Sequence, residues 1–572
     1  MLLNDSKELR APTPGGLRTV IVGSGAVGLY AARELSERGH DVVVIESGGV
    51  GLDSFPQESY SSVGLTHDGI RLGRSRSLGG TTNLWGGQLV EFQPVDFEGR
   101  DWLPHSKWPV TYGEISPYYR RTYENLGISG EILDDLQVFK HVFGSKPHFE
   151  EGLEMFLTRW LKIPSFAVSY AKEIRSSENL SVLLNHTVVG FVSSNGQITA
   201  VRAIDCTGQT HVIEGDRFIL AAGTIEICRL LLHGAATKGW DCPWRDNVNV
   251  GAYFQDHLCG RIASVHPIDS RRFFDTFCNL VGSGHKYQPK VRLTNETLER
   301  THILNVHGTF CFESSIAENL IYLKQFLKAA INSRKISGMG DFFSNLRACG
   351  KHLLPLMWKY AVANRIFVPS TSKIALGIQS EQTPLRESRI TIDSSVTDAR
   401  GLPKVILDWK AGSEELASIR EFALRCDRAL CAARLADLKI SEALLNSDPG
   451  FLATLRDNYH QAGGARMADS EQDGVVDRNL RVFGTRNLYV AGAASFRTTS
   501  NANTTFTALA FVTRLVDHLT SQSARHRSTA DAQRARYPNV ISGLWHFSLS
   551  NDSFPIARCR HVFSWAPFVA PE

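Results

Sequence analysis

The sequence lacks the features that mark several large classes of protein. Its ten cysteines include no C-x-x-C pair, and histidine and cysteine are not clustered at zinc-like spacing. Neither a disulfide framework nor a bound metal is therefore expected, and a reducing compartment is the default. No run of about eighteen apolar residues occurs, and residues 1–16 have no apolar signal core. We expect a cytoplasmic protein without an integral membrane segment.

An excess of charge of one sign is also missing. The 62 basic residues face 58 acidic ones, so the net charge is only +4. Charge therefore gives no reason to expect nucleic acid or an acidic polymer as a partner, and a small molecule fits better. The 572 residues exceed one ordinary hydrophobic core. We expect two intimate domains, with the chain crossing between them several times and room for a buried cofactor.

A glycine turn between two apolar strands is the strongest signal that is present. Residues 19–46 read as strand, glycine turn, helix and strand. Gly23 permits the tight turn, Gly25 lets the backbone approach a pyrophosphate, and Gly28 lets the helix pack closely on the strand. The helix N-terminus favours negative charge, and Glu46 can accept hydrogen bonds from ribose hydroxyls. The pattern predicts a dinucleotide-binding site.

Later segments combine glycine with asparagine or aromatic residues. Residues 77–87 read S-L-G-G-T-T-N-L-W-G-G, and residues 221–232 lead from a strand through glycine into a helix. Between them and the C-terminal motifs, the stretch 260–409 mixes strand-like and helical patterns. It ends in a strand pair at 388–393 and 405–409, which is interpreted as part of a substrate domain's sheet.

Four further motifs follow the first fingerprint and residues 77–87. They are V-G-A-Y-F-Q-D-H at 250–257, N-Y-H-Q-A-G-G-A-R-M at 458–467, N-L-Y-V-A-G-A-A-S at 487–495 and S-N-A-N-T-T-F-T-A-L-A at 500–510. The order of these motifs resembles that of the glucose-methanol-choline (GMC) flavoprotein oxidoreductases. The G-G-T-T-x-x-W-G-G variant is most similar to the sugar-oxidising branch, which includes pyranose oxidases and fructose and gluconate dehydrogenases. The resemblance implies an α/β protein with a Rossmann-like FAD-binding domain and an intertwined α+β substrate domain that carries an antiparallel sheet.

The resemblance also implies a division of the chain. The FAD-binding domain comprises three parts, 17–105, 172–260 and 455–521, the last of which carries the catalytic His and Asn. Residues 106–171 are cap or substrate elements, 261–454 form the substrate domain, and 522–572 are an aromatic C-terminal extension. Within the substrate domain, residues 316–365 have a helical pattern with many basic residues. We interpret them as a cover over the pocket with a solvated basic face, and a membrane-surface or partner-docking role is the alternative.

The chemistry of hydride transfer identifies candidate catalytic residues. An enzyme that moves a hydride from a carbinol carbon to flavin N5 must also remove the hydroxyl proton. His460 is the candidate base, because neutral imidazole has an ordinary pKa of about 6.5. By resemblance, Asn503 is its partner and donates to the substrate oxygen. Asn501 could carry this role instead, and Asn503 could simply cap the helix expected over 504–519.

The resemblance implies the cofactor contacts as well. They comprise the fingerprint, the G-G-T-T segment, the adenine strand, the 221–223 turn and the C-terminal loops: Gly23, Gly25, Ala26, Gly28, Glu46, Ser47, Gly79, Gly80, Thr81, Thr82, Asn83, Val188, Ala221, Ala222, Gly223, Gly492, Ala493, Thr504 and Thr505. His186 lies on the same strand as Val188, and an ordinary strand role explains it equally well. Leu84 stands where branches with covalent flavin carry histidine, so FAD should be noncovalent.

Three further positions depart from the family pattern. Thr504 and Arg497 replace prolines, and Gly492 replaces an acidic residue. The first two bear on substrate recognition, whereas Gly492 leaves room for backbone contact with the cofactor.

The expected function is FAD-dependent oxidation of a hydroxyl on a sugar, glycoside or sugar-like natural product to a carbonyl. The electron acceptor is O2, a quinone, a cytochrome or a dye. A dehydrogenase subunit that passes electrons to a quinone or cytochrome partner is the alternative, as is a GMC-type enzyme for a non-sugar alcohol or a lyase. A homo-oligomer is compatible with the sequence, which leaves the exact substrate open.

Overall fold

The computed structural model describes the chain in several ranges: 1–11, 16–51, 57–128, 135–282, 285–314, 316, 318–323, 326, 339–361 and 364–536. Its contacts divide the chain into two units, Met1–Thr520 and Ser521–Glu572. In the second unit, the described residues belong to the end of helix α14 (Thr504–Arg536). The aromatic residues expected to pack near the C-terminus lie outside the described residues.

A parallel sheet of six strands forms the first layer of the first unit. In spatial order its strands are β1 (Leu2–Leu3), β7 (Leu180–Leu183), β3 (Asp41–Ile45), β2 (Arg18–Val22), β11 (Arg217–Leu220) and β21 (Leu488–Val490). Nearly every residue of these strands is buried, as expected for a parallel sheet covered on both faces. Helices α1 (Ala26–Glu37) and α7 (Thr224–Ala236) follow β2 and β11. The two edge strands of the sheet, β1 and β21, are almost 490 residues apart in sequence.

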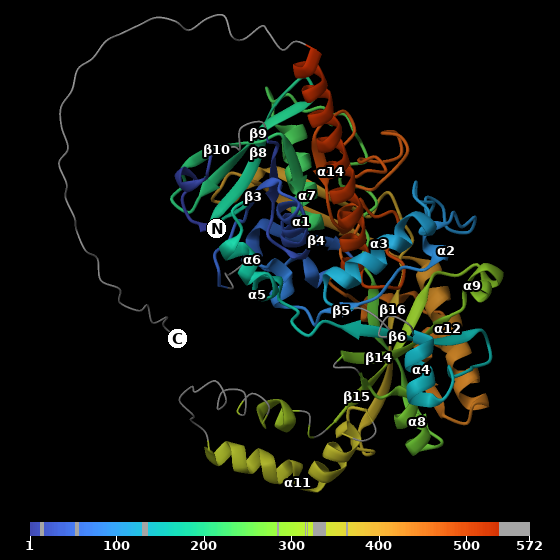
Figure 1. Ribbon diagram of the computed structural model, residues 1–572. Helices are drawn as coiled ribbons and strands as arrows, with labels where there is room; N and C mark the ends of the chain where they lie inside the picture. Colours follow the sequence, from blue (N-terminus) through green and yellow to red (C-terminus); the bar gives the residue numbers. More distant parts are fainter. Residues whose placement is uncertain are drawn as a thin grey trace, which may run out of the picture. The chain divides into compact units, whose positions relative to one another are not determined.

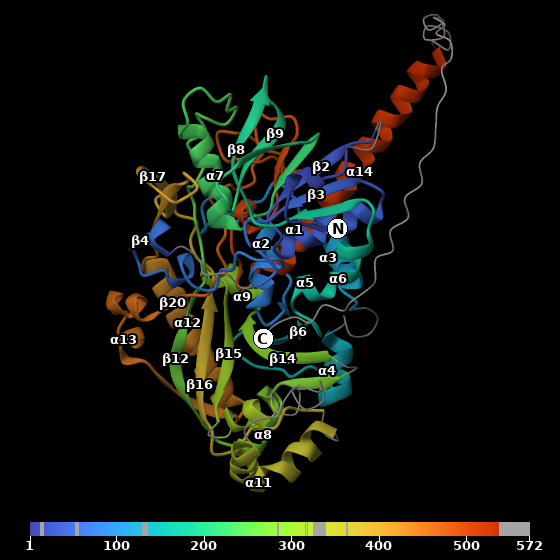
Figure 2. The ribbon, with the colours of Figure 1, turned by 90° about the vertical axis from the view of Figure 1, so that its left-hand side faces the viewer.

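A nine-stranded antiparallel sheet forms the second layer. Its strands are β19 (Ala436–Ile440), β12 (Leu258–Pro267), β16 (Lys373–Ser380), β15 (Val306–Glu313), β14 (His285–Leu293), β6 (Leu153–Trp160) and β5 (Gln88–Leu89), with β13 (Leu280–Gly282) on β14 and β20 (Arg456–Asp457) on β12. Figure 2 shows β12, β16 and β15 side by side. In Figure 1 this sheet lies at the end of the first unit away from β3 and α1. The expected fold class is confirmed.

Helix α12 (Ser413–Ala432) covers the antiparallel sheet. Its side chains Ile419, Phe422 and Cys426 are fully buried and belong to the same hydrophobic cluster as Val306 and Leu376. Their spacing of three and four residues places them on one helix face. A separate hydrophobic cluster surrounds the parallel sheet, so each layer has its own core.

Two small sheets complete the first unit. One contains β10 (Thr210–Glu214), β9 (Gln197–Asp205) and β8 (His186–Ser194), and the other contains β17 (Arg389–Thr397), β18 (Pro403–Trp409) and β4 (Tyr60–Gly64). The strand pair expected at 388–393 and 405–409 is present, but its assignment to the main substrate sheet is wrong. Strand β18 pairs instead with β4 in parallel, which makes a separate sheet. The sequence alone could not reveal this long-range pairing.

The remaining helices connect and cover these sheets. They are α2 (Pro94–Phe97), α3 (Tyr112–Asn125), α4 (Asp135–Phe143), α5 (Phe166–Ser169), α6 (Ala171–Ser176), α8 (Ser270–Phe277), α9 (Asn295–Thr301), α11 (Met339–Ala361) and α13 (Glu442–Leu445). Helix α3 begins with a capping box, because Thr111 and Glu114 each accept a hydrogen bond from the other's backbone N–H.

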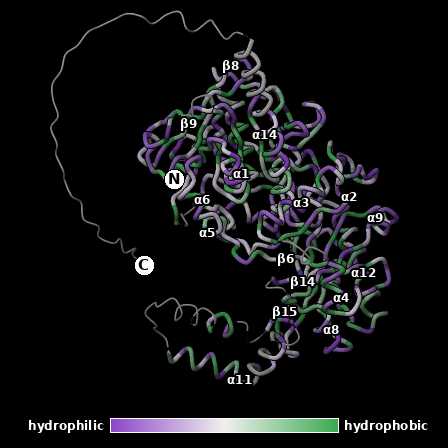
Figure 3. The backbone as a smooth tube through the Cα atoms, in the orientation of Figure 1, coloured by the Kyte–Doolittle hydropathy of each residue, from purple (hydrophilic) through white to green (hydrophobic). Residues whose placement is uncertain are grey.

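Helix α11 lies within the basic segment 316–365 that was predicted to be helical. Figure 3 shows hydrophilic and hydrophobic residues alternating along it. Other parts of the predicted segment, including 327–338, lie outside the described residues. Within the described ranges, no helix combines the length and apolar character needed to cross a bilayer.

Candidate active site

A cavity of about 510 Å³ opens where the strands of the parallel sheet end. Ligands of open α/β sheets bind at such carboxyl ends. Most of the residues expected at the cofactor or in catalysis line it: Gly23, Gly25, Ala26, Glu46, Ser47, Gly80, Thr81, Thr82, Val188, Ala221, Ala222, Gly223, His460, Gly492, Ala493, Asn503, Thr504 and Thr505. The fold thus brings together residues from both ends of the sequence.

The three fingerprint glycines have different surroundings. Gly23 has a φ of +102°, and a Cβ there would lie 2.7 Å from the carbonyl oxygen of Ala221. A Cβ on Gly28 would lie 2.0 Å from the carbonyl oxygen of Gly23, so only glycine lets α1 approach β2 this closely. A Cβ on Gly25 would meet no atom within 4 Å. Because Gly25 lines the cavity, the space left by its missing side chain is the cavity itself.

Gly28, Gly79 and Asn83 were expected at the cofactor, but they are not among the cavity-lining residues. Gly28 serves the packing just described. Gly79 has a φ of +90° and starts the turn Gly80–Asn83. The Asn83 amide donates to the carbonyl of Leu78 at 2.9 Å and accepts from the Ser165 hydroxyl at 2.6 Å. These residues therefore shape the walls instead of facing the cavity.

Glu46 is held in place by hydrogen bonds from the glycine turn and from the residues that follow Glu46 in sequence. Its carboxylate accepts hydrogen bonds from the Ser24 N–H at 2.9 Å, the Ser24 hydroxyl at 2.7 Å and the Gly48 N–H at 2.9 Å. Burial raises its pKa, and these hydrogen bonds oppose that effect. The Ser47 hydroxyl also donates to the carboxylate, at 3.2 Å, so its acceptor sites are filled. A ligand hydroxyl from the cavity would take the place of this long contact.

His460 lies between two polar side chains at the cavity wall. Its Nδ1 is 2.8 Å from Nδ1 of His257, and its Nε2 receives the Asn503 amide at 3.1 Å. Its backbone N–H donates to Asp256 at 2.9 Å. The backbone and both ring nitrogens are therefore fixed by named partners.

The hydrogen bonds of His257 determine which ring nitrogen of His460 carries the proton. Nε2 of His257 faces the carbonyl oxygens of Thr499 and Ser500 at 3.2 and 3.0 Å, so this nitrogen must be the donor. Burial lowers the pKa of His257, which favours its neutral form. Neutral His257 can then only accept at Nδ1, and His460 must donate from its own Nδ1. The network leaves Nε2 of His460 unprotonated, and its lone pair accepts the Asn503 amide at 3.1 Å.

Electrostatics keep His460 neutral as well. Burial is the main cause that lowers its pKa to about 3, with His257 and Lys290 acting in the same direction and Asp256 opposing them. Protonation would place a charge in a poorly solvated site beside another imidazole. The ring is therefore an unprotonated acceptor at neutral pH.

Asp256 organises the loop that carries His460. It is fully buried, and its carboxylate accepts from the backbone N–H groups of His257 at 2.7 Å and His460 at 2.9 Å, while its other oxygen is 3.1 Å from Nε2 of His67. Although burial opposes ionisation, the hydrogen bond and charge of His67 hold the pKa of Asp256 below its ordinary value. Sequence reasoning missed Asp256 and His257 as site residues. Their only signal was the adjacent acid and histidine in the motif at 250–257.

The structure distinguishes the two asparagines proposed as partner of His460. Asn501 is buried, donates to the Asn305 side chain at 2.7 Å and does not line the cavity. Asn503 does line the cavity, and its Oδ1 is buried without a hydrogen-bond partner among the described residues. An unpartnered acceptor at a cavity wall is suited to a ligand hydroxyl. The geometry therefore favours Asn503.

Several residues without a sequence-based assignment share the cavity. They include amides and aromatic rings: Gln88, Asn458, Gln461, Trp85, Trp160 and Tyr459. Helix α14 begins at Thr504, so its N-terminal N–H groups are also at the wall. Together with the glycine turn, this gives backbone donors for phosphate, a carboxylate for ribose and a separate polar group around His460. The donor set fits a flavin dinucleotide with a substrate beside it.

Comparison with known families supports this assignment of the cavity. Residues 18–238 match the family described as FAD dependent oxidoreductase, and residues 384–511 match the family described as GMC oxidoreductase. The first match contains the glycine turn and Glu46, and the second contains His460 and Asn503.

Several curated proteins are similar over most of their length. The chain is 22% identical to 2-methyl-1,2-propanediol dehydrogenase of Mycolicibacterium austroafricanum, covering 77% of this chain and 80% of that protein. It is 21% identical to 6'''-hydroxyparomomycin C oxidase of Streptomyces lividus, with 88% and 92% covered. It is also 21% identical to the fructose dehydrogenase large subunit of Gluconobacter japonicus, with 81% and 84% covered.

A solved structure shares the fold. The crystal structure of pyridoxine 4-oxidase from Mesorbium loti aligns with a TM-score of 0.56 at 17% identity, covering 88% of this chain and 99% of that chain. At this identity, the likeness concerns the fold alone.

Proposed function

Because the chain belongs to the GMC family of FAD-dependent oxidoreductases, we propose that it oxidises a hydroxyl of a sugar, glycoside or sugar-like compound to a carbonyl. The observation that carries the proposal is the unprotonated Nε2 of His460, whose lone pair accepts the Asn503 amide at the cavity wall. A base and a donor on one wall are what removal of a hydroxyl proton requires.

The residues around His460 divide the work of proton removal. Bound FAD supplies the hydride acceptor. The substrate oxygen displaces the direct 3.1 Å contact between Nε2 of His460 and the Asn503 amide and comes within hydrogen-bond reach of both groups. Nε2 then accepts the hydroxyl proton, and the Asn503 amide donates to the oxygen as negative charge develops there. The negative charge of Asp256, which lies next to His460 and accepts its backbone N–H, favours the positive charge that the ring acquires.

The composition of the cavity wall supports a substrate with several hydroxyl groups. Gln88, Asn458 and Gln461 offer amide donors and acceptors, and the rings of Trp85 and Trp160 offer flat apolar faces. Amides that bind hydroxyls and rings that cover C–H groups suit a sugar ring better than a simple hydrocarbon alcohol. The names of two relatives, which contain fructose and hydroxyparomomycin, agree with this class.

Two finer points belong to the same proposal. FAD is bound noncovalently, since Leu84 and not histidine precedes Trp85 at the cavity wall. The electron acceptor is O2 or a quinone, cytochrome or dye, and the similar proteins include both an oxidase and dehydrogenases.

An anaerobic absorbance experiment tests the proposal. The purified protein is mixed with sugars, glycosides, aminosugars, sterols and simple alcohols while the oxidised-flavin band is followed. We expect a sugar-like compound to bleach the band, and readmission of air then tests O2 as acceptor. If only a sterol or a simple alcohol bleaches the band, the proposal of a sugar-like substrate is wrong. If the purified protein is colourless and stays colourless after incubation with FAD and removal of the unbound FAD, FAD binding is contradicted.

A further inference from the structure

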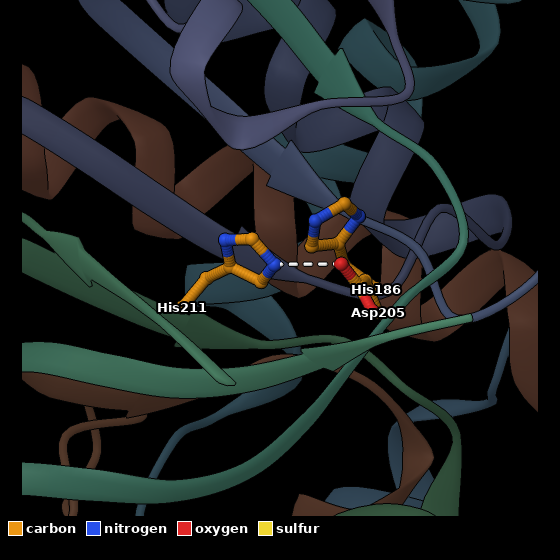
Figure 4. A group of neighbouring side chains, drawn as sticks. All are labelled: His186, Asp205 and His211. Atoms are coloured by element: carbon orange, nitrogen blue, oxygen red, sulfur yellow. Dashed lines mark hydrogen bonds and ion pairs between the residues drawn. The ribbon is translucent and has the colours of Figure 1, made fainter. Parts of the chain in front are cut away.

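A group of metal-ligating side chains lies on the small sheet formed by β8, β9 and β10, and the proposed oxidation makes no use of it. Figure 4 shows the side chains of His186, Asp205 and His211 close together, with a dashed line from His211 to Asp205. One ligand atom from each residue lies within 4.8 Å of the other two. The three residues come from three strands, since His186 begins β8, Asp205 ends β9 and His211 is in β10.

His186 presents a bare nitrogen to this group. Its Nδ1 is 2.7 Å from the carbonyl oxygen of Leu184, so Nδ1 carries the proton. Nε2 is then an acceptor, and it is buried without a hydrogen-bond partner among the described residues. The residue as a whole is only 1% exposed. A buried lone pair without a partner is unfavourable unless a ligand meets it.

Asp205 is oriented by its own turn. One carboxylate oxygen, Oδ1, accepts from the Thr207 N–H at 2.8 Å, the Thr207 hydroxyl at 2.6 Å and the Gln209 N–H at 3.0 Å. The other oxygen, Oδ2, contacts Nε2 of His211 at 2.8 Å. The turn therefore holds one oxygen and leaves the second directed at the histidines.

His211 has a partner for its other ring nitrogen. The Ser6 hydroxyl lies 2.7 Å from Nδ1 of His211. With Nε2 protonated, the ring donates to Asp205 and accepts from Ser6. With the proton moved to Nδ1, the ring donates to Ser6, and Nε2 becomes a free ligand atom. The hydroxyl can serve either form because it both donates and accepts.

We propose that His186, Asp205 and His211 bind a divalent transition-metal ion, of which Zn²⁺ is the probe of choice. Two imidazole nitrogens and a carboxylate oxygen are typical zinc ligands, and water completes four-fold coordination. Each ligand is also held from behind, by the Leu184 carbonyl, the Ser6 hydroxyl and the turn at Thr207. Metal-ligating histidines characteristically donate their second ring N–H in this way.

The geometry needs only a small adjustment to bind the ion. Zinc bonds of about 2.0–2.1 Å place tetrahedral ligand atoms roughly 3.4 Å apart. The His211–Asp205 contact is 2.8 Å, and no two of the three ligand atoms are more than 4.8 Å apart, so shifts of about an ångström reach this value. The change of tautomer at His211 supplies its lone pair without release of a proton. The ion would cross-link β8, β9 and β10 and bring the N-terminal segment at Ser6 against them.

The flavin cavity offers a competing explanation for His186. This residue lines the cavity, so its Nε2 could instead face the adenine end of the cofactor. His211 and Asp205 do not line the cavity, and substitutions there separate the two explanations. The site does not depend on the proposed oxidation, and zinc binding can be measured without substrate.

Zinc titration of the full-length FAD-loaded protein, first treated with a chelator, tests the proposal. We expect one Zn²⁺ per chain, a higher Tm in its presence, and unchanged flavin absorbance. His211→Ala and Asp205→Asn should each raise the Kd at least tenfold, and Ser6→Ala about tenfold or more. His141→Ala, which removes an exposed histidine from α4, is the matched control and should bind zinc as the original chain does.

Either of two outcomes would overturn the proposal. The first is absence of stoichiometric uptake by the FAD-loaded original chain, or uptake only after FAD is removed, which would assign His186 to the cofactor. The second is an unchanged Kd in folded His211→Ala and Asp205→Asn proteins. If both variants fail to fold, the titration and elemental analysis of the original chain still decide the question.

Discussion

The two ends of the flavin cavity are built in different ways. The glycine turn is built by residues close in sequence: Gly23, Gly25 and Gly28 act through backbone shape, and Glu46 directly follows the next strand, β3. Around His460, side chains from distant segments form a buried polar network. The first end depends on the absence of side chains, whereas the second depends on which atom of each side chain carries a proton. Substitutions should therefore affect cofactor retention at one end and the rate of flavin reduction at the other.

The largest expected effect is at the base. His460→Ala should slow substrate-dependent flavin reduction by about two to four orders of magnitude, the usual value of a positioned acid or base. FAD should remain bound, because the glycine turn is untouched. Stopped-flow reduction under anaerobic conditions, together with the flavin-to-protein absorbance ratio, measures both quantities. A normal reduction rate would remove His460 from the mechanism.

A smaller effect is expected behind the base. His257→Gln should slow reduction by about one to two orders of magnitude, because the fixed acceptor for the Nδ1–H of His460 is lost and both tautomers of the base become populated. A second variant, His257→Asn, carries the same amide on a shorter side chain and tests whether an amide placed there can accept the Nδ1–H of His460 and restore the rate. If His257 only supports the fold, the reduction rate should stay normal in folded protein, and thermal stability alone should fall.

A matched pair of glycine substitutions probes the other end. Gly28→Ala should lower the free energy of unfolding by about 1–3 kcal/mol, since the new Cβ would overlap the Gly23 carbonyl oxygen. Gly25→Ala should leave stability of the FAD-free protein nearly unchanged, because no atom lies within 4 Å of its Cβ, but should weaken FAD binding. Denaturant unfolding and FAD titration check the pair. Equal effects of both substitutions on FAD-free stability would contradict the distinction.

The smallest expected effect concerns pH. His460 has a folded-state pKa of about 3 and an ordinary unfolded value of about 6.5. Below the unfolded value the unfolded chain binds more protons, so stability is complete above about pH 6.5 and falls toward pH 3. His257 acts in the same direction. Through His460, the free energies of unfolding at pH 7 and 5.5 should differ by about 1 kcal/mol, and His460→Ala should reduce the difference.

The flavin site shows how far sequence patterns reach. The fingerprint and its acid could be predicted because glycine sterics and strand periodicity act over a few neighbouring residues. The hairpin at 389–409 could be predicted as a strand pair for the same reason, but its pairing with β4 could not, since that partner lies more than 300 residues away. Gly79 and Asn83 were expected at the cofactor because a sequence motif does not distinguish residues that line the cavity from residues that hold the lining residues in place.

The sequence by itself determined the resemblance to the GMC family, the parallel dinucleotide-binding layer and the choice of His460 as candidate base, because each rests on local residue order. Only the tertiary structure decided the tautomer of His460, the preference for Asn503 over Asn501 and the meeting of His186, Asp205 and His211. The absence of zinc-like spacing gave no hint of that last group. Strand pairing brings these residues together across the sheet, and hydrogen-bond donors can be assigned only when every partner's position is known.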